Sequence, residues 1–321
     1  RFAETRSSAL LADALAETGF LVERGVGGID TAFIASAGSG KPVIAILGEF
    51  DALAGLSQQA GCARPEPLEV NGNGHGCGHN LLGTAGVAAA CAVKAWMEQH
   101  HAGGTVRFYG CPGEEGGSGK TFMVREGLFD DVDAAVTWHP EGFSGMFNLR
   151  TLANIQAAFS FKGIAAHAAN SPHLGRSALD AVTLMNTGAN FLREHIEQEA
   201  RLHYAITNSG GVSPNVVQAD AEVLYLIRAP SLPQAQAIYQ RVINIARGAA
   251  LMTDTTLTVR FDKACSDYVP NRALEAVMER YLHHFGLPDY SDEERAFAAE
   301  LRATLTDDDL RNARLNAARI G

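Results

Sequence analysis

The chain has 321 residues, of which 46% are hydrophobic and 19% charged, and its formal net charge is −10. This composition predicts a globular chain long enough for two domains and excludes an intrinsically disordered one. Nucleic acids and anionic membranes require clustered lysine and arginine, so the acidic balance argues against both partners. No apolar run approaches the ~20 residues that span a bilayer, and no signal peptide opens the chain.

Five cysteines are present, at positions 62, 77, 91, 111 and 265. An odd number in a chain of this size is not typical of a disulfide framework. Free thiols suit a reducing compartment, so the cytoplasm is the expected location.

Helices and strands are expected to alternate through the first 150 residues. In chain order the periodicities predict a helix at 7–18, a strand at 42–47, a helix at 82–98, a strand at 106–109, a short helix at 119–127 and a strand at 134–138. This alternation favours an α/β fold with a mixed, mostly parallel sheet covered on both faces. Ligands of such sheets bind just beyond the carboxyl ends of the strands.

The order of elements changes after residue 150. The pattern predicts a strand at 155–161, a long helix at 177–199, strands at 203–207 and 216–227, a helix at 231–249 and a strand at 256–261. This β-α-β-β-α-β order is that of a ferredoxin-like fold. We therefore expect residues 151–265 to form an α+β domain inserted into a first domain made of residues 1–150 and a mainly helical segment, 266–321.

A glycine-rich segment from Asn73 to Asn80 carries the first residues suited to metal chemistry. Cys77 and His79 lie two positions apart, so an extended backbone would project both side chains to the same side. A thiolate and an imidazole placed together bind a borderline-soft divalent metal.

Two further segments follow predicted strands. Glu114 and Glu115 come shortly after the strand at 106–109, and His139 comes directly after the strand at 134–138. Adjacent side chains point in different directions, so one glutamate can bind a metal while the other faces its water. His139 would share their rim of the sheet if the two strands are neighbours. The three segments together predict a metal site for hydrolysis.

Each residue alone has a simpler explanation. A strand-end histidine is usually structural, glutamates in a glycine-rich turn are usually solvated, and a cysteine is usually a small buried apolar residue. Cys77 and His79 could also form a nucleophile–base pair, although residues two apart rarely reach the required geometry. A phosphate-binding loop at 117–121 is discounted, because Glu114 stands where that motif needs glycine.

Four motifs occur in a characteristic order along the chain: Gly48-Glu49-Phe50-Asp51-Ala52-Leu53, His75-Gly76-Cys77-Gly78-His79-Asn80, Gly113-Glu114-Glu115-Gly116 and Gly163-Ile164-Ala165-Ala166-His167-Ala168. In this order they resemble the M20 metallopeptidase family, and most closely its amidohydrolase branch that cleaves N-acyl amino acids. The resemblance extends over essentially the whole chain.

The resemblance implies a role for each matching residue of the first domain. Glu114 matches the family's general base, which activates water and then protonates the leaving amine. The residues that match the metal ligands are Cys77, His79, Glu115 and His139. The implied cofactor is one or two divalent ions of Mn or Zn.

Residues of the inserted domain match positions that contact the substrate. His167 matches a histidine that reaches the neighbouring subunit's site and steadies the oxyanion. Asn215 and Arg228 match positions that can contact a substrate carboxylate, for which the arginine fork is suited. The inserted domain is thus expected to be a dimerisation or lid domain, in a homodimer or in a hetero-oligomer with a related subunit.

The activity implied by the resemblance is hydrolysis of an N-acyl amino acid, with p-aminobenzoyl-glutamate, a folate breakdown product, as the expected substrate. A broader N-acyl amino acid hydrolase or dipeptidase is one alternative. A non-catalytic partner subunit is another, although intact Glu114 and Glu115 argue against it. A plain binding module would not explain why ligand-type residues recur at strand ends.

Two features depart from the family's pattern. Glu49 stands where dinuclear members have the histidine of a His-x-Asp motif, so Asp51 either orients His79 or the site differs. The family also has a metal-ligating histidine near its C-terminus, and the histidines at 283–284 lie in a helical stretch that does not fit that role. We expect a complete protein to continue beyond Gly321 and to supply this histidine.

Overall fold

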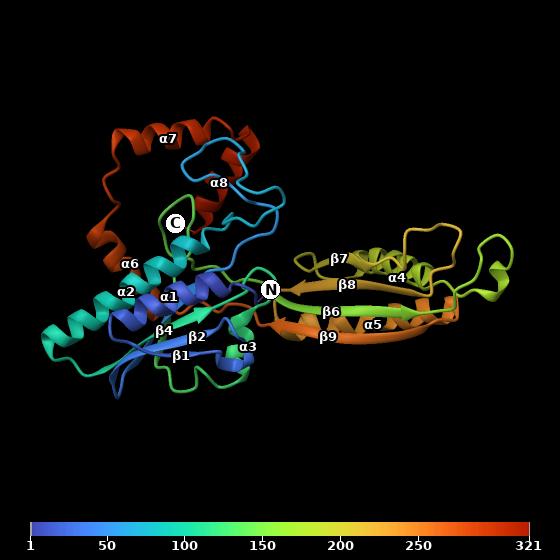
Figure 1. Cartoon of the computed structure of the whole chain (residues 1–321), viewed down its shortest axis with the longest axis horizontal. Coiled ribbons are helices and arrows are strands. Elements are labelled where there is room, and N and C mark those ends of the chain that lie inside the picture. Colours follow the sequence, from blue (N-terminus) through green and yellow to red (C-terminus); the bar gives the residue numbers. More distant parts are fainter. Residues whose placement is uncertain (1, 321) are drawn as a thin grey trace. The chain divides into compact units, whose positions relative to one another are not determined.

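The computed structural model describes residues 2–320, so Arg1 and Gly321, the outer ends of the predicted first domain, lie outside the described residues. The chain divides into two compact units. Unit 1 comprises Arg1–Met146 with Val277–Gly321, and unit 2 comprises Phe147–Ala276. Each unit has its own sheet (Figure 1).

Unit 1 contains a mixed five-stranded sheet in the order β1-β2-β4-β3-β5. β3 (Val43–Glu49) lies between β4 (Gly104–Cys111) and β5 (Ala134–Val136) and pairs in parallel with both. These three strands confirm the predicted ones. β2 (Phe33–Ser39) pairs antiparallel with β4 and with β1 (Leu21–Arg24), and neither of these two strands was predicted.

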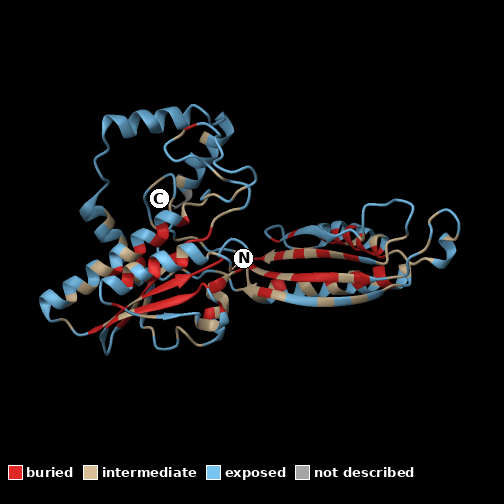
Figure 2. Cartoon of the chain, in the orientation of Figure 1, coloured by how far each residue is buried: buried red, intermediate tan, exposed pale blue. Residues whose placement is uncertain are grey.

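Helices cover both faces of this sheet because side chains alternate along each strand. Phe108 of β4 packs with α1 (Thr5–Glu17) and α2 (His79–His100) on one face. The next residue, Tyr109, packs on the other face with Met123 of α3 (Gly119–Arg125). Figure 2 shows the resulting buried strands. The predicted α/β class with a mixed sheet is therefore confirmed.

Three further helices follow: α6 (Arg272–Phe285), α7 (Asp292–Arg302) and α8 (Asp307–Ile320). The helical character predicted for this segment is confirmed. Ser291 and Glu294 begin α7 with a reciprocal capping box, which satisfies two otherwise unpaired backbone N–H groups. Within residues 2–320, none of the helices has the length and apolarity needed to cross a bilayer.

Unit 2 is a four-stranded antiparallel sheet in the order β7-β8-β6-β9. Its elements in chain order are β6 (Ala153–Lys162), α4 (Ala178–Leu192), β7 (Arg201–Asn208), β8 (Asp220–Ala229), α5 (Leu232–Thr253) and β9 (Thr256–Cys265). The two helices pack against alternate residues of β6 and β8, including Phe159 and Tyr225. The helix predicted at 177–199 is too long, because α4 ends at Leu192 and a 3₁₀ turn, Arg193–His195, follows.

Candidate metal site

Three parallel strands of unit 1 end at one edge of the sheet, which we call the strand-end rim. β4 leads into Glu114 and Glu115, and β5 leads to His139. The sequence-based prediction required these two strands to be neighbours, but β3 lies between them. Their parallel orientation still brings their carboxyl ends to the same edge. The intervening strand adds Glu49, its own last residue.

Three of the predicted metal ligands meet on this rim. One ligand atom each of Cys77, His79 and His139 lies within 4.8 Å of the others. Cys77 Sγ is 3.3 Å from His139 Nε2, and the rings of His79 and His139 are perpendicular with their centroids 5.6 Å apart. A sulfur and two imidazole nitrogens at this spacing are a ligand set suited to a borderline-soft divalent metal.

Gly78 allows the Cys77 loop to approach the His139 loop. Its φ is +77°, a left-handed conformation that favours glycine, and α2 begins at the next residue. A Cβ at this position would lie 2.8 Å from the side chain of Pro140, the residue after His139. The backbone between Cys77 and His79 therefore turns into a helix, in place of the extended segment that the sequence predicted.

His79 is fully buried and is oriented by Asp51. His79 Nδ1 lies 2.9 Å from Asp51 Oδ1, and Asp51 Oδ2 accepts a 3.0 Å hydrogen bond from the Glu115 N–H. Burial alone would raise the pKa of Asp51, but these two hydrogen bonds hold that pKa below its usual range. The bond to Asp51 in turn raises the pKa of His79, which burial opposes. Of the two alternatives for Asp51, the geometry favours the one in which it orients the histidine.

The other nitrogen of His79 provides a test of whether these residues fit a metal. Nε2 is buried and has no hydrogen-bond partner among the described residues, although Glu49 Oε2 lies 3.1 Å away. When Nδ1–H donates to Asp51, Nε2 presents a lone pair toward carboxylates. One oxygen each of Glu49 and Glu114 lies within 4.8 Å of a ring nitrogen of His79. A protonated ring would pair with Glu49 through Nε2, whereas a neutral ring presents a lone pair to a cation at the same place, so the site fits a divalent metal.

The charge of the rim also bears on Cys77. Burial, then the carboxylates of Glu115, Glu114 and Glu49, raise the pKa of this thiol to about 11. A nucleophile and a metal ligand both act as the thiolate, so this shift does not separate the two roles. The imidazole nitrogen 3.3 Å from the sulfur is His139 Nε2, whereas Nδ1 of His79 faces Asp51. This pairing disfavours the alternative of a Cys77–His79 nucleophile–base pair.

The two glutamates differ in their surroundings. Loss of surrounding water, followed by repulsion from Glu49, raises the pKa of Glu114, and Lys120 opposes that rise. A raised pKa suits a carboxylate that must accept and return a proton. The Glu115 carboxylate belongs to neither three-residue group of ligand atoms, but it interacts directly with the Cys77 thiol.

Lys120 is a rim residue that the sequence analysis did not identify, since it entered there only as part of the discounted phosphate loop. Its ammonium group, in the first turn of α3, pairs with Glu49 Oε1. The available signal was Glu49 itself, an acid where dinuclear members of the family have the histidine of a His-x-Asp motif. No local pattern indicates a contact between residues 71 positions apart.

Two of the three predicted residues of unit 2 lie close together. Ala168 N–H, next to His167, donates to the Asn215 carbonyl at 2.9 Å. His167 Nδ1 accepts hydrogen bonds from the N–H groups of Ala169 and Asn170, both at 3.2 Å. The neutral ring then carries its proton on Nε2, which can donate a hydrogen bond to a ligand.

Arg228 lies at the opposite end of the unit 2 sheet. The loops of His167 and Asn215 adjoin the end where Lys162 pairs with Asp220, whereas Arg228 follows eight residues along β8. That separation is roughly 25 Å in an extended strand. Asn215 and Arg228 of one chain therefore cannot both hold one carboxylate.

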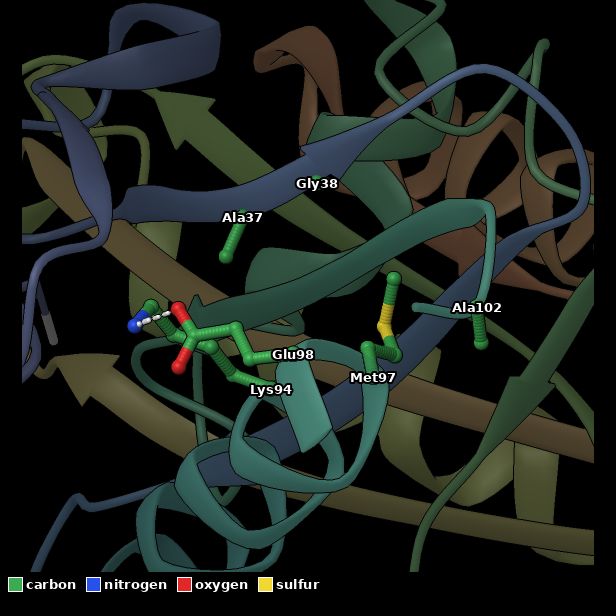
Figure 3. A pocket seen from close by; sticks show the side chains of 6 residues that line it. All are labelled: Ala37, Gly38, Lys94, Met97, Glu98 and Ala102. Carbon is green, nitrogen blue, oxygen red and sulfur yellow. Dashed lines mark hydrogen bonds and ion pairs between the residues drawn. The ribbon is translucent and has the colours of Figure 1, made fainter. Parts of the chain in front are cut away.

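A surface pocket of about 180 Å³ lies away from the rim, between β2 and the end of α2 (Figure 3). Its polar side chains, Lys94 and Glu98, pair with each other at 2.6 Å. The remaining lining residues are Ala37, Gly38, Met97 and Ala102. Because its two charged side chains pair with each other and its other lining residues are apolar or glycine, this pocket offers no evident chemistry.

Comparison with known proteins places this geometry in context. The profile of peptidase family M20/M25/M40 matches residues 45–286. The chain is 70% identical over 321 residues to one of the subunits of p-aminobenzoyl-glutamate hydrolase from Escherichia coli (strain K12), covering 100% of this chain and 67% of that protein. It is 33% identical over 259 residues to Xaa-Arg dipeptidase of Mus musculus, covering 77% of this chain and 55% of that protein.

Solved structures share the fold. An aminobenzoyl-glutamate utilization protein from Klebsiella pneumoniae superposes with a TM-score of 0.66 at 19% identity, over 94% of this chain and 84% of that chain. A Bacillus subtilis protein, described as a dinuclear metal binding peptidase from the M20 family, gives a TM-score of 0.56 at 20% identity, over 88% and 74%. Apart from the E. coli hydrolase subunit, the curated relatives with the next highest similarity are spanned by this chain over little more than half their length.

Proposed function

Because the chain belongs to peptidase family M20/M25/M40, we propose that it is a metal-dependent amidohydrolase subunit that cleaves p-aminobenzoyl-glutamate to p-aminobenzoate and glutamate. The observation that carries the proposal is the meeting of Cys77, His79 and His139 beside Glu114 on the strand-end rim. The similarity to the E. coli hydrolase over the whole of this chain supports the substrate.

The residues proposed to hold the metal are Cys77, His79, Glu115 and His139. One or two ions of Mn or Zn suit this mixture of sulfur, nitrogen and oxygen donors. When bound, such an ion polarises the scissile carbonyl and makes water acidic enough to be deprotonated near neutral pH. Asp51 keeps the His79 ring in the orientation that presents Nε2.

Glu114 is the proposed general base and then the general acid. Its carboxylate takes a proton from the attacking water as the new C–O bond forms at the amide carbon. It then delivers that proton to the amine nitrogen as the C–N bond breaks, so no net proton stays on the protein. The raised pKa of Glu114 supports both halves of this transfer.

Unit 2 is proposed to be a ferredoxin-like dimerisation domain that serves two sites. His167 and Asn215 would act in a neighbouring subunit's site, where Nε2–H of His167 would donate to the oxyanion. Arg228 would hold a substrate carboxylate with its bidentate fork. The separation of Arg228 from the other two across the sheet supports this division between sites.

The charge around Arg228 supports an acidic substrate. Arg201 of β7 pairs directly opposite Arg228 of β8, so both side chains project from the same face of the sheet. Directly opposed like charges are unfavourable unless an anion lies near them. This favours a glutamate-containing substrate over the alternative of a broader N-acyl amino acid hydrolase or dipeptidase.

The proposed assembly is a homodimer or a hetero-oligomer with a related subunit. A second, distinct chain of the E. coli p-aminobenzoyl-glutamate hydrolase is 28% identical to this chain over 252 residues, which supports a related partner. A non-catalytic role beside such a partner is the second candidate. The meeting of Cys77, His79 and His139 near Glu114 favours catalysis in this chain.

Amide hydrolysis with and without the related partner chain tests the proposal. The full chain, reconstituted with Mn²⁺ or Zn²⁺, should release p-aminobenzoate from p-aminobenzoyl-glutamate faster than it cleaves a dipeptide with a C-terminal arginine. Glu114→Gln in this chain alone should abolish that release. Full activity of a complex that carries Glu114→Gln would contradict the proposal and support a non-catalytic role.

A further inference from the structure

A chain of polar contacts links Lys120 to the proposed metal ligands. The Lys120 ammonium pairs with Glu49 Oε1, and the other Glu49 oxygen lies 3.1 Å from His79 Nε2. His79 Nδ1 contacts Asp51 at 2.9 Å, and Asp51 accepts from the Glu115 N–H at 3.0 Å. The contacts join β3, α2 and the loop after β4.

These contacts hold the Glu114–Glu115 loop at both of its ends. Asp51 binds the backbone of Glu115, and Glu49 binds Lys120 five residues later. Both acids lie at the end of β3, where Glu49 is 8% and Asp51 4% exposed. These contacts fix the loop on the sheet, because two buried acceptors at and just beyond the end of β3 hold a backbone donor of the loop and the Lys120 side chain in the first turn of α3.

Glu49 has the chemistry of a metal ligand but a different partner. Its carboxylate oxygen belongs to a three-residue group with His79 and Glu114 that could itself hold a cation. His79 belongs to both groups. Because its Nδ1 faces Asp51, Nε2 is the nitrogen left for a metal, and its single lone pair can serve only one group at a time. The Lys120 ammonium already supplies a positive charge to Glu49.

Resting on the proposed function, we propose that Lys120 is a positioning residue that acts as a fixed cation. By occupying Glu49, it keeps that carboxylate from competing for the metal and leaves His79 Nε2 to the group with Cys77 and His139. It also holds the loop that carries Glu114 at its working distance.

Removal of the ammonium should change metal binding as well as turnover. In Lys120→Met, Glu49 is free to compete for the metal, so the affinity of the main site for Mn²⁺ should fall about ten- to a hundredfold. A loss of this size is typical when a residue that orients ligands is removed. A second, weaker Mn²⁺ should appear. The value of kcat should fall at least about tenfold with KM changed by less than about threefold, since the proposed role of Lys120 is through Glu49 rather than through the substrate.

The double variant distinguishes this role from simple destabilisation. Adding Glu49→Gln to Lys120→Met removes the freed carboxylate, so the additional Mn²⁺ should disappear. Lys120→Arg keeps a cation and should restore most of kcat. Lys94→Met breaks a comparable lysine–glutamate pair on α2 and should leave Mn²⁺ binding and kcat unchanged.

The experiment is Mn²⁺ equilibrium dialysis with steady-state kinetics on the full chain and these variants. Wild-type stoichiometry, affinity and kcat in Lys120→Met would overturn the inference about Lys120 and leave the proposed function intact. Equal losses of Mn²⁺ affinity and kcat in Lys94→Met and Lys120→Met would overturn it as well. Absence of Mn²⁺ and Zn²⁺ binding in the wild type would instead remove the proposed function, and this inference with it.

Discussion

The strand-end rim of unit 1 and the sheet of unit 2 bury very different side chains. The rim buries Glu49, Asp51 and His79, which are held by hydrogen bonds and an ion pair. The core of unit 2 is apolar apart from pairs such as Tyr225 Oη–H donating to Asn186 at 2.7 Å. The chemistry of the rim therefore depends on the identity of single atoms, whereas the stability of the core depends on the apolar area that it buries.

The largest expected effect tests whether one rim atom controls the chemistry. Glu114→Gln keeps the shape of the side chain but removes the proton acceptor, so kcat should fall by a factor of about 10² to 10⁴. Pre-steady-state and steady-state hydrolysis of p-aminobenzoyl-glutamate measure this loss. The metal content should stay at the wild-type level. Turnover close to that of the wild type would mean that Glu114 is not the base.

The second prediction tests the apolar region. Phe159 is fully buried and packs edge-to-face on Tyr225, with ring centroids 5.6 Å apart. Phe159→Ala should lower the free energy of unfolding of unit 2 by about 3–5 kcal/mol, because it opens a cavity in the core. Urea unfolding followed by circular dichroism measures it. Phe191, which is 70% exposed, is the matched control, and its alanine variant should change stability little.

A smaller effect is expected from the carboxylate that orients His79. Asp51→Asn should weaken Mn²⁺ binding by about 10- to 100-fold, since the amide no longer fixes the ring through a charged acceptor. Isothermal titration of metal-free protein gives the dissociation constant. Asp131→Asn breaks the exposed pair with Arg107 and serves as control. Equal affinities of the two variants would show that Asp51 does not orient the ring.

The smallest effect concerns pH and the open face of the unit 2 sheet. Hydrogen bonds from Ser160 (2.6 Å) and Thr207 (2.8 Å) hold the pKa of Glu222 below its usual value of 4.5. The native state then gains stability from this carboxylate above pH 4.5, and loses it as the pH falls through the lowered pKa.

Glu222→Gln should therefore cost less than about 1 kcal/mol near neutral pH, because the group is partly exposed. The difference from wild type should shrink on acidification below pH 4.5, as urea unfolding at several pH values would measure. A difference that stays constant or grows toward low pH would show that these hydrogen bonds do not favour the charged form.

Apolar runs made the central strands of unit 1 predictable. Val43–Glu49 is flanked by turns and is buried on both sides, which is the pattern that periodicity detects. Phe33–Ser39 was missed because alanine, serine and glycine fill its second half, and Leu21–Arg24 because it is short and largely exposed. Pairing with β4 and with each other makes both of them strands, and that pairing is tertiary.

The candidate site was predictable where residues follow strands. Placement after β4 and β5 brought Glu114, Glu115 and His139 to one rim, together with Cys77 and His79. The left-handed turn at Gly78 and the Lys120–Glu49 pair depend on contacts distant in sequence, so no local pattern carries them. Motif order supplied the proposed role of His167, and only the folded loop shows that its Nδ1 accepts backbone hydrogen bonds.

The most direct test of the central claim is a Co²⁺ titration followed by absorption spectroscopy. Thiolate coordination gives a charge-transfer band, so the full chain should develop that band in proportion to bound Co²⁺, with release of the Cys77 proton. Cys77→Ser should lose the band, and Cys62→Ser should keep it. A Co²⁺ complex without a thiolate band, or a band that survives in Cys77→Ser, would contradict a metal site built on the strand-end rim.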